Sequence, residues 1–243
     1  MKTKNILFLV IAIVLLTTSS RCVSIGNGVS PSKNYITRDF KVSGFDILDL
    51  NTVADIEYTQ STDGSSSLQI YGSDNIVELV NVDVKDNTLI LNMKKKSINK
   101  TDLKISISSP NLQSIKTSGV GNFNIKDKLE AANLKVKNEG VGNIKINDIS
   151  CQELDLRTEG VGNVQIQGKV EKASLTSQGV GNIDASNLES KSVIATSDGV
   201  GSISCHATQS IHARVNGVGG ISYKGNPTEK DLKKNGVGSI KQK

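Results

Sequence analysis

Few side chains in this chain of 243 residues could do covalent or metal chemistry: it has three cysteines, two histidines and no tryptophan. Cys22 has the most distinctive surroundings. It lies just after an apolar run, Ile6–Leu16, which itself follows Lys2 and Lys4. A positive start, a short apolar run and small polar residues form the pattern of a secretory signal peptide, and the run is too short for an ordinary membrane span. We therefore predict that residues 1–22 are a signal peptide.

The thiol of Cys22 is a candidate for lipidation, because a Cys at this place resembles the site where bacterial lipoproteins receive a diacylglycerol. Arg21 stands where such proteins normally have a small residue. Ordinary cleavage near Ser20 or Ser24 is the alternative, and it would give a soluble exported protein. The first partner we expect is thus a membrane, reached through an N-terminal lipid anchor at the outer membrane or cell surface. Without lipidation, a periplasmic or secreted protein is expected.

The other cysteines and the histidines could in principle form a disulfide or a metal site. Cys151 and Cys205 could pair in an oxidising compartment, and His206 and His212 are close in sequence. Two His and three Cys supply neither a His-rich zinc site nor one held by four cysteines. We expect the histidines to lie on the surface, and we expect no metal and no cofactor.

Two sets of acidic residues recur at regular spacing. Glu139, Glu159 and Asp198 share one phase of a repeat, and Asp127 and Asp148 share another. The first set could hold a cation, and the second could be a catalytic carboxylate pair. The alternatives are an exposed acidic edge and a column of turn residues, and we favour these. Accordingly, we expect no catalytic residues.

The repeat that sets these phases is the motif Gly-Val-Gly, which occurs seven times at spacings of 21, 20, 19, 20, 18 and 19 residues. Its fourteen glycines are Gly119, Gly121, Gly140, Gly142, Gly160, Gly162, Gly179, Gly181, Gly199, Gly201, Gly217, Gly219, Gly236 and Gly238. Each motif is followed by two alternating apolar-polar segments, as expected for short strands. A unit of this size cannot bury its own apolar face, but stacked copies can.

The sequence therefore predicts an all-β fold, a parallel β-helix with about 19–20 residues per rung. Rungs stack at about 4.8 Å, so equivalent residues form columns. We expect three columns to fill the core. The first is Val120, Val141, Val161, Val180, Val200, Val218 and Val237; the second is Phe123, Ile144, Val164, Ile183, Ile203, Ile221 and Ile240; the third is Ile125, Ile146, Ile166, Ala185, Cys205 and Tyr223.

The recurring glycines are explained by positive φ or by tight packing at a corner. A phosphate-binding loop would need a following helix, and none is predicted. Asn122, Asn143, Asn163 and Asn182 also align. We predict that they form a polar ladder from rung to rung, although a row of binding residues is the alternative.

The same geometry predicts that two cysteines stay unpaired. Cys151 and Cys205 lie three rungs apart, or about 14 Å along the axis. A disulfide requires Cα atoms within about 7 Å. We expect Cys205 to act as a small apolar residue in the third column.

The domain boundaries follow from the repeat. Residues 118–243 hold the Gly-Val-Gly copies, and residues 39–117, strand-rich but without the motif, are expected to be irregular N-terminal rungs of the same single domain, 39–243. Residues 23–38, rich in Ser, Gly and Asn, are expected to be a flexible tether. Without residues 1–22 the chain keeps 26 basic and 24 acidic residues. That small excess, together with export, argues against a nucleic-acid partner.

The order of several short segments resembles a known family. These are Phe45–Ile47, Asn51–Ile56, Val84–Leu91 and Ile107–Leu112, followed by the Gly-Val-Gly-Asn array. Together they resemble the family described as "putative auto-transporter adhesin, head GIN domain", over roughly residues 40–240. The resemblance implies a right-handed β-helix and an envelope location. It supplies no catalytic residues.

The expected function is a non-catalytic exported binding or adhesion module of the cell envelope. A glycan or a matrix or surface protein is the expected ligand, and the sequence gives no oligomeric state. Two alternatives remain open: a carbohydrate-active enzyme, either a polysaccharide lyase or a hydrolase, on the same scaffold, and an envelope structural or sensing accessory.

Overall fold

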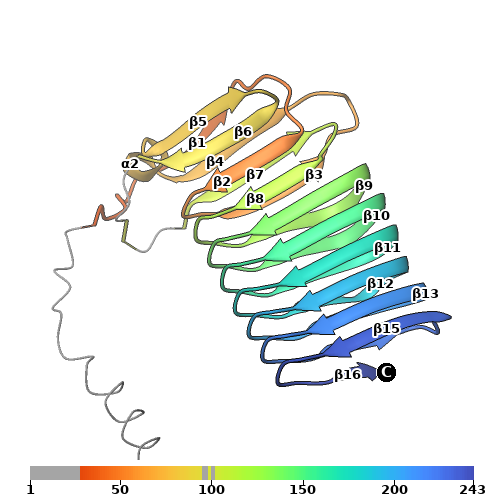
Figure 1. The fold of residues 1–243 in the computed structure, drawn as a ribbon. Helices are drawn as coiled ribbons and strands as arrows, with labels where there is room; N and C mark the ends of the chain where they lie inside the picture. The colour runs from red at the N-terminus through yellow and green to blue at the C-terminus, as the bar shows by residue number, and fades with distance from the viewer. Residues whose placement is uncertain (1–27, 95–97, 100–101) are drawn as a thin grey trace, which may run out of the picture.

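Five long, bent strands stacked in parallel form the central part of the molecule (Figure 1). The structure, a computed structural model, describes residues 28–94, 98–99 and 102–243. The long strands are β9 (Phe123–Asn138), β10 (Ile144–Thr158), β11 (Val164–Ser177), β12 (Ile183–Ser197) and β13 (Ile203–Val215). Together they form a parallel β-solenoid of about six rungs with about 20 residues per rung, which confirms the predicted fold class. The signal peptide and Cys22 lie outside the described residues.

Each rung has two walls and an edge. The first part of each long strand lies in what we call the first wall, which β14 (Ile221–Lys224) and β16 (Ile240–Gln242) continue. The last part lies in the second wall, which β15 (Glu229–Lys234) continues. The Gly-Val-Gly segments join the second wall of one rung to the first wall of the next. We call this side the turn edge; it is on the left in Figure 1.

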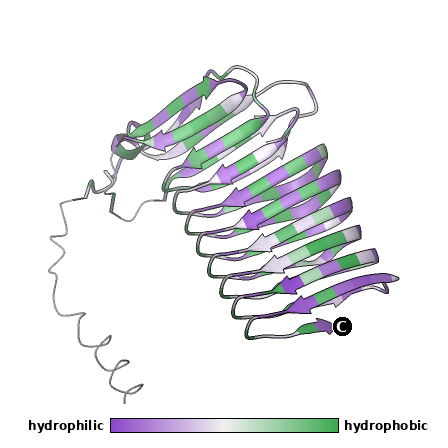
Figure 2. Ribbon diagram, in the orientation of Figure 1, coloured by the Kyte–Doolittle hydropathy of each residue, from purple (hydrophilic) through white to green (hydrophobic). Residues whose placement is uncertain are grey.

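Alternation within each wall places apolar side chains inside, and Figure 2 shows the resulting bands of green and purple. The predicted second and third columns lie in the core except at the last rung: Phe123, Ile144 and Ile146, for example, are at most 2% exposed. From the second wall, residues such as Leu134, Leu154 and their equivalents meet them. The core is therefore a set of stacked aliphatic columns, which explains how a chain with few aromatic residues can fill it.

The predicted valine column is wrong as a core column. Val120, Val141, Val161, Val180, Val200, Val218 and Val237 are between 49% and 74% exposed. The cause is that successive side chains of an extended strand point to opposite faces. Alternation continues through the motif, and Val161 lies three positions before the buried Val164, so the two side chains point to opposite sides. The glycines on either side of each valine lie against the backbone of the preceding rung.

The N-terminal part begins the stack and then covers its end. Strands β2 (Ile47–Asn51) and β3 (Asp55–Gln60) form one rung, which pairs in parallel with β8 (Ser114–Thr117) and β9. Strands β6 (Thr88–Met93) and β7 (Lys104–Ser109) pair in parallel with the other edges of β2 and β3. Through this pairing the first half of the domain is continuous with the solenoid.

The expectation of irregular rungs alone is too simple, because antiparallel strands complete this end. β1 (Tyr35–Phe40) pairs with β4 (Ser67–Ser73), β4 with β7, and β5 (Val80–Lys85) with β6, all antiparallel. Asp86 and Asn87, both at positive φ, form the tight turn between β5 and β6. A single helical turn, α2 (Asp74–Val77), follows β4 and buries Ile76.

The boundary expected after residue 38 lies inside β1. Tyr35–Phe40 is paired along its length with β4. Before it, the Ser32 hydroxyl donates a hydrogen bond to Asp74 Oδ1 (2.5 Å) and the Ser32 backbone N–H donates to Asn75 Oδ1 (3.0 Å). The polar residues that suggested a tether are therefore used to hold this segment against α2.

Candidate functional site

The turn edge is built so tightly that only glycine fits at two of its three positions. A Cβ placed on Gly162 would lie 2.0 Å from the carbonyl oxygen of Gly142, and one on Gly160 would lie 2.0 Å from that of Gly140. Gly162 also has a φ of +142°, whereas no positive φ is found at Gly160. Tight packing therefore acts at both positions and positive φ only at the second. These glycines are structural corners, and their close approach lets the valine between them stack in register.

The asparagines form a ladder along the same edge. The side-chain oxygen of Asn143 accepts a hydrogen bond from the backbone N–H of Asn163 (2.9 Å), and that of Asn163 accepts one from Asn182 (3.0 Å). The ladder continues to Ser202, whose N–H donates to Asn182 Oδ1 (2.8 Å). The ladder mainly joins a side chain to the next backbone, rather than one side chain to another. The amide groups are exposed at its outer side.

The repeated acids Glu139 and Glu159 are matched by basic side chains. Glu139 pairs with Lys137 and with Lys116 (3.3 Å), and Glu159 pairs with Lys137 (3.3 Å) and Arg157 (2.6 Å). Lys137 donates a hydrogen bond that holds the pKa of Glu139 below its usual range. Two acids surrounded by three cations do not make a site for a metal cation. Asp198 instead accepts hydrogen bonds from the amides of Gln178 and Asn216.

The expected column of Asp127 and Asp148 does not form. Asp148 is paired with Lys128, because the register between β9 and β10 shifts by one residue after Ile146. Lys128 is itself bound to Glu130 at 2.5 Å, and this hydrogen bond raises its pKa. The equal spacing in the sequence thus hides a bulge.

The two described cysteines are buried and unpaired, as predicted. Burial raises the pKa of the Cys151 thiol to about 11 and that of Cys205 to about 12. Cys205 lies in the third column, between Ala185 and Tyr223, at 1% exposure. Burial thus disfavours the thiolate, which is the reactive form of cysteine.

The histidines do not converge on a common site. His206 is half-buried in the first wall, and His212 is exposed on the second. Nδ1 of His212 lies 3.6 Å from Asp231. Within residues 28–94, 98–99 and 102–243, no three His, Cys, Asp or Glu residues are grouped as a metal site would require. The same residues contain no helix long and apolar enough to span a membrane.

A groove of about 650 Å³ crosses the outer face of the second wall, and we call it the wall groove. Its floor and rim come from the loop before β8 and from β9 to β12. Its lining includes Gln113, Ala131, Ala132, Asn133, Leu134, Lys135, Glu153, Leu154, Asp155, Lys172, Ala173, Ser174, Ser192 and Ile194. Small residues make the hollow: Ser174 stands where the next rung carries Ile194, and Ser192 stands where the preceding rung carries Lys172.

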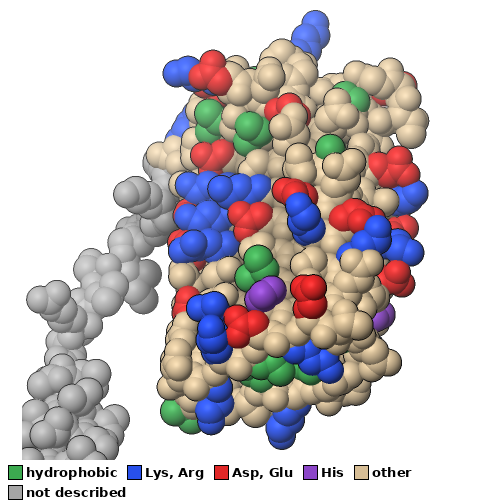
Figure 3. Space-filling model, turned by 45° about the vertical axis from the view of Figure 1, so that its right-hand side comes forward, with side chains coloured by type: hydrophobic (Ala, Val, Ile, Leu, Met, Phe, Trp, Pro, Cys, Tyr) green, Lys and Arg blue, Asp and Glu red, His purple; other side chains and the backbone are tan. Residues whose placement is uncertain are grey.

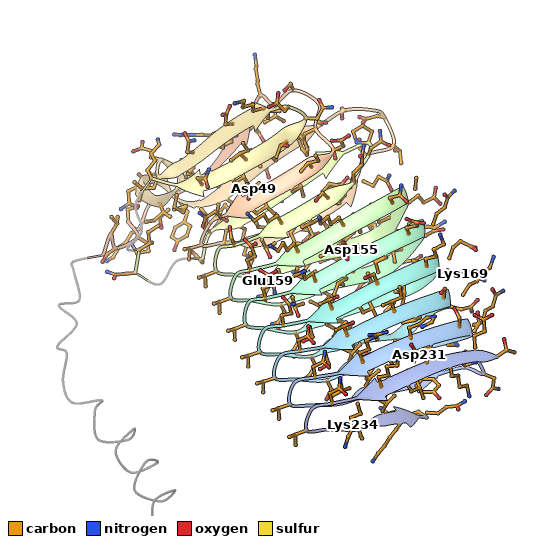
Figure 4. All side chains as sticks on the ribbon, in the orientation of Figure 1. Asp49, Asp155, Glu159, Lys169, Asp231 and Lys234 are labelled. Atoms are coloured by element: carbon orange, nitrogen blue, oxygen red, sulfur yellow. The ribbon has the colours of Figure 1, made fainter. Side chains whose placement is uncertain are left out.

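Charges of both signs surround the wall groove, as the interspersed blue and red side chains of Figure 3 show for this face. Glu153 pairs with Lys172 at 2.9 Å across neighbouring rungs. Lys135 and Asp155 face outward at equivalent positions, and Figure 4 shows Asp155 on the second wall. Neither forms an ion pair with any residue that the structure describes. Sequence reasoning missed this site, because its walls come from side chains that vary between repeats.

One further copy of the turn was also missed. Thr52-Val53-Ala54-Asp55 occupies the place of Gly-Val-Gly-Asn in the rung of β2 and β3, and Val53 bridges Val120. Asp55 Oδ1 accepts the backbone N–H of Asn122 at 2.9 Å and so begins the Asn ladder. The sequence signal for this copy was a valine followed two residues later by a short polar residue, as in Gly-Val-Gly-Asn. This copy is the first in the row of valine bridges. No preceding Gly-Val-Gly turn packs against it, so Thr52 and Ala54 have room for their side chains.

The chain is similar to several proteins of known structure. A putative adhesin from Bacteroides fragilis has a crystal structure with a TM-score of 0.87; it is 51% identical and aligns over 89% of this chain and all of that one. A putative adhesin from Parabacteroides merdae (TM-score 0.67, 22% identity, 87% and 98% coverage) and a putative lipid binding protein from Parabacteroides distasonis (0.67, 24%, 87% and 98%) share the fold. No curated protein matches the chain. The family model described as "Putative auto-transporter adhesin, head GIN domain" matches residues 44–227, and the chain belongs to this family.

Proposed function

We propose that the chain is a non-catalytic, exported binding module that adheres to its ligand through the wall groove. The family and the similar putative adhesins support a binding role. The observation that carries the proposal is the groove itself: about 650 Å³ of hollow on a face whose backbone is fixed by parallel pairing on both sides. A rigid wall positions its side chains before the ligand arrives, which lowers the entropy cost of binding.

The chemistry of the lining favours a protein ligand over a glycan. No aromatic side chain lines the groove, whereas sugar sites commonly offer an aromatic face for stacking. The lining combines aliphatic groups (Ala131, Leu154, Ile194) with the outward charges of Lys135 and Asp155. It spans five rungs, or about 19 Å, which accommodates about six residues of extended peptide. An extended segment with apolar side chains and charges of both signs fits best.

Location is the second part of the proposal. We place the module in the cell envelope, held by a lipid on Cys22 after export. The family's adhesin description supports a surface location. Intact-mass measurement of the mature protein tests the anchor. A mass that includes a diacylglyceryl group on Cys22 supports it, and an unmodified Cys22, or cleavage after it, rules it out.

A carbohydrate-active enzyme is less well supported. A general acid needs a raised pKa, but the carboxyl groups whose pKa the fold shifts, such as Glu130, Glu139 and Glu189, are all shifted downward. Assays on acidic and neutral polysaccharides, with and without Ca²⁺, test this alternative, and robust cleavage would replace our proposal. An envelope accessory without an external ligand is the other alternative.

The binding proposal is tested with an array of matrix proteins, surface proteins and glycans, probed with the purified chain. Ser174 lies in the middle of the wall groove, and Ser174→Arg fills it. Gln165 lies on the same strand but in the first wall, so Gln165→Arg is the matched control. We expect protein hits that survive Gln165→Arg and are lost with Ser174→Arg. Hits confined to glycans, or hits indifferent to Ser174→Arg, would overturn the assignment.

A further inference from the structure

The exposed valines form a continuous ridge, because each bridges the next, and we call it the Val ridge (Val120, Val141, Val161, Val180, Val200, Val218 and Val237). Each valine is held by two backbone hydrogen bonds to the preceding rung. The N–H of Val161 donates to Gly140 O at 2.9 Å, and its carbonyl accepts from the N–H of Gly142 at 2.9 Å. No other outward column of the solenoid is both uniform and apolar in the described residues: the column of Lys135, for example, contains acidic, polar and apolar members.

An open groove of about 450 Å³ runs beside this ridge, and we call it the edge groove. The Val ridge forms one side, and the polar column of Glu139, Glu159, Gln178 and Asp198 forms the other. The first glycine of each motif forms its floor, and since glycine has no side chain the hollow is continuous across the rungs. The Asn ladder lies on the far side of the ridge.

The spacing of the ridge identifies what fits this surface. Valines repeat at the rung spacing of about 4.8 Å, whereas an extended peptide presents side chains on one face every 6.6–6.8 Å, roughly. A peptide lying along the ridge loses register within two or three rungs. A second ridge of the same period stays in register over the whole length, as in the paired columns of a steric zipper.

We propose that two copies of this chain associate in parallel through their turn edges. A two-fold axis parallel to the stack, placed between ridge and groove, puts the Val ridge of each copy into the edge groove of the other. Such a contact is isologous and closes as a dimer. The rods then point the same way, which suits two copies displayed from one surface.

The polar columns are complementary in this arrangement. The same two-fold axis brings the Asn ladder of one copy against the polar column of the other. Side-chain amides of Asn143 and Asn163 then face Glu139, Glu159 or Asp198, so N–H donors meet carboxylate acceptors. An antiparallel dimer would instead place ridge on ridge and polar column on polar column, and it would leave both edge grooves unfilled.

The size of the contact sets its strength. Seven valines span six intervals, or about 29 Å, and the contact is one ridge and one groove wide. The area that such a narrow strip buries on each partner is below the roughly 800 Å² of a standard interface. The dimer is therefore weak and forms at high local concentration.

The first test is sedimentation equilibrium of the full chain up to millimolar concentration. Val161→Lys and, separately, Val180→Lys place charges on the ridge and are expected to weaken association at least tenfold. Tyr71, also a large hydrophobic residue and 40% exposed, lies on β4 outside both grooves, and Tyr71→Lys is the matched control. A monomer at all concentrations, or equal effects of the ridge and control variants, would overturn the proposal.

The second test fixes the orientation with nitroxide labels in a Cys22→Ser background, where the buried Cys151 and Cys205 stay unlabelled. Val141→Cys and Val218→Cys each provide one label site. In the parallel dimer, labels at 141 of both copies lie close together, and labels at 141 and 218 are separated by four further rungs, about 19 Å. A short distance between 141 and 218 in mixed samples would show an antiparallel contact and contradict the proposal.

Discussion

At the scale of single residues, the turn edge has no room for one methyl group. Gly162→Ala places a Cβ about 2.0 Å from Gly142 O at a φ of +142°. Strain and overpacking each cost about 1–3 kcal/mol, so we expect the free energy of unfolding to fall by about 3 kcal/mol or more. Gly44, exposed and with no atom within 4 Å of its Cβ position, is the control. Denaturant unfolding in which both alanine variants match the native chain would contradict this account.

The Asn ladder makes a prediction that separates hydrogen bonding from shape. Asn163→Ala removes the acceptor of the Asn182 N–H, and we expect a loss of about 1 kcal/mol in the free energy of unfolding. Asn163→Asp keeps the acceptor, as Asp55 does naturally beneath Asn122, and should lose less. Thermal unfolding of the two variants compares them. Equal losses would show that the oxygen is not what the ladder needs.

The buried thiols give a direct measure of core integrity. With pKa values of about 11 at Cys151 and about 12 at Cys205, neither is a thiolate at pH 8 in the folded chain. We expect a thiol reagent to leave both unmodified in the native protein and to modify both after denaturation, as read by mass spectrometry. Rapid native labelling of Cys205 would mean that the third column is open.

At the scale of elements, the sequence predicts what repeats and misses what varies. The seven motifs were sufficient for the solenoid, the glycine corners and the Asn ladder, because every rung imposes the same backbone contact. Val161 lies an odd number of positions before the buried Val164, so its outward orientation was predictable. The apolar character of valine instead suggested a place in the core. The bulge before Asp148 and the wall groove around Ser174 depend on differences between neighbouring rungs, which a repeat consensus averages away.

The charged edge of the second wall links stability to pH. Hydrogen bonds from Lys137 and Lys116 lower the pKa of Glu139 in the folded chain. Its contribution is therefore complete above the unfolded pKa of about 4.3 and is lost as pH falls through the lower folded value. We expect Glu139→Gln to cost about 0.5 kcal/mol at pH 7 and nothing below the folded pKa.

The matched control for this pH effect is Glu229→Gln, since Glu229 is exposed and forms no ion pair among the described residues. Unfolding in denaturant across a pH series from 7 down to about 2 measures both variants. A Glu139→Gln deficit that stays unchanged over the whole series would point to packing rather than charge as its cause.

At the scale of the whole molecule, rungs are interchangeable units. Deleting residues 160–178 joins Glu159 to the next Gly-Val-Gly motif and removes one rung. Because stability in such stacks is roughly a sum over neighbouring units, we expect a folded, shorter rod with a modestly lower melting temperature. Deleting residues 164–173 removes half a rung and breaks every column below it. Circular dichroism should show cooperative melting for the first deletion and none for the second.

Rigid stacking is also what turns variable outward residues into a binding surface, and the central claim is that the wall groove is that surface. The most direct measurement is a titration of the strongest protein ligand from the array against the native chain, Ser174→Arg and Gln165→Arg, with all three shown to melt alike. The account predicts at least tenfold weaker binding for Ser174→Arg and unchanged binding for Gln165→Arg. Equal affinity of all three proteins would contradict it.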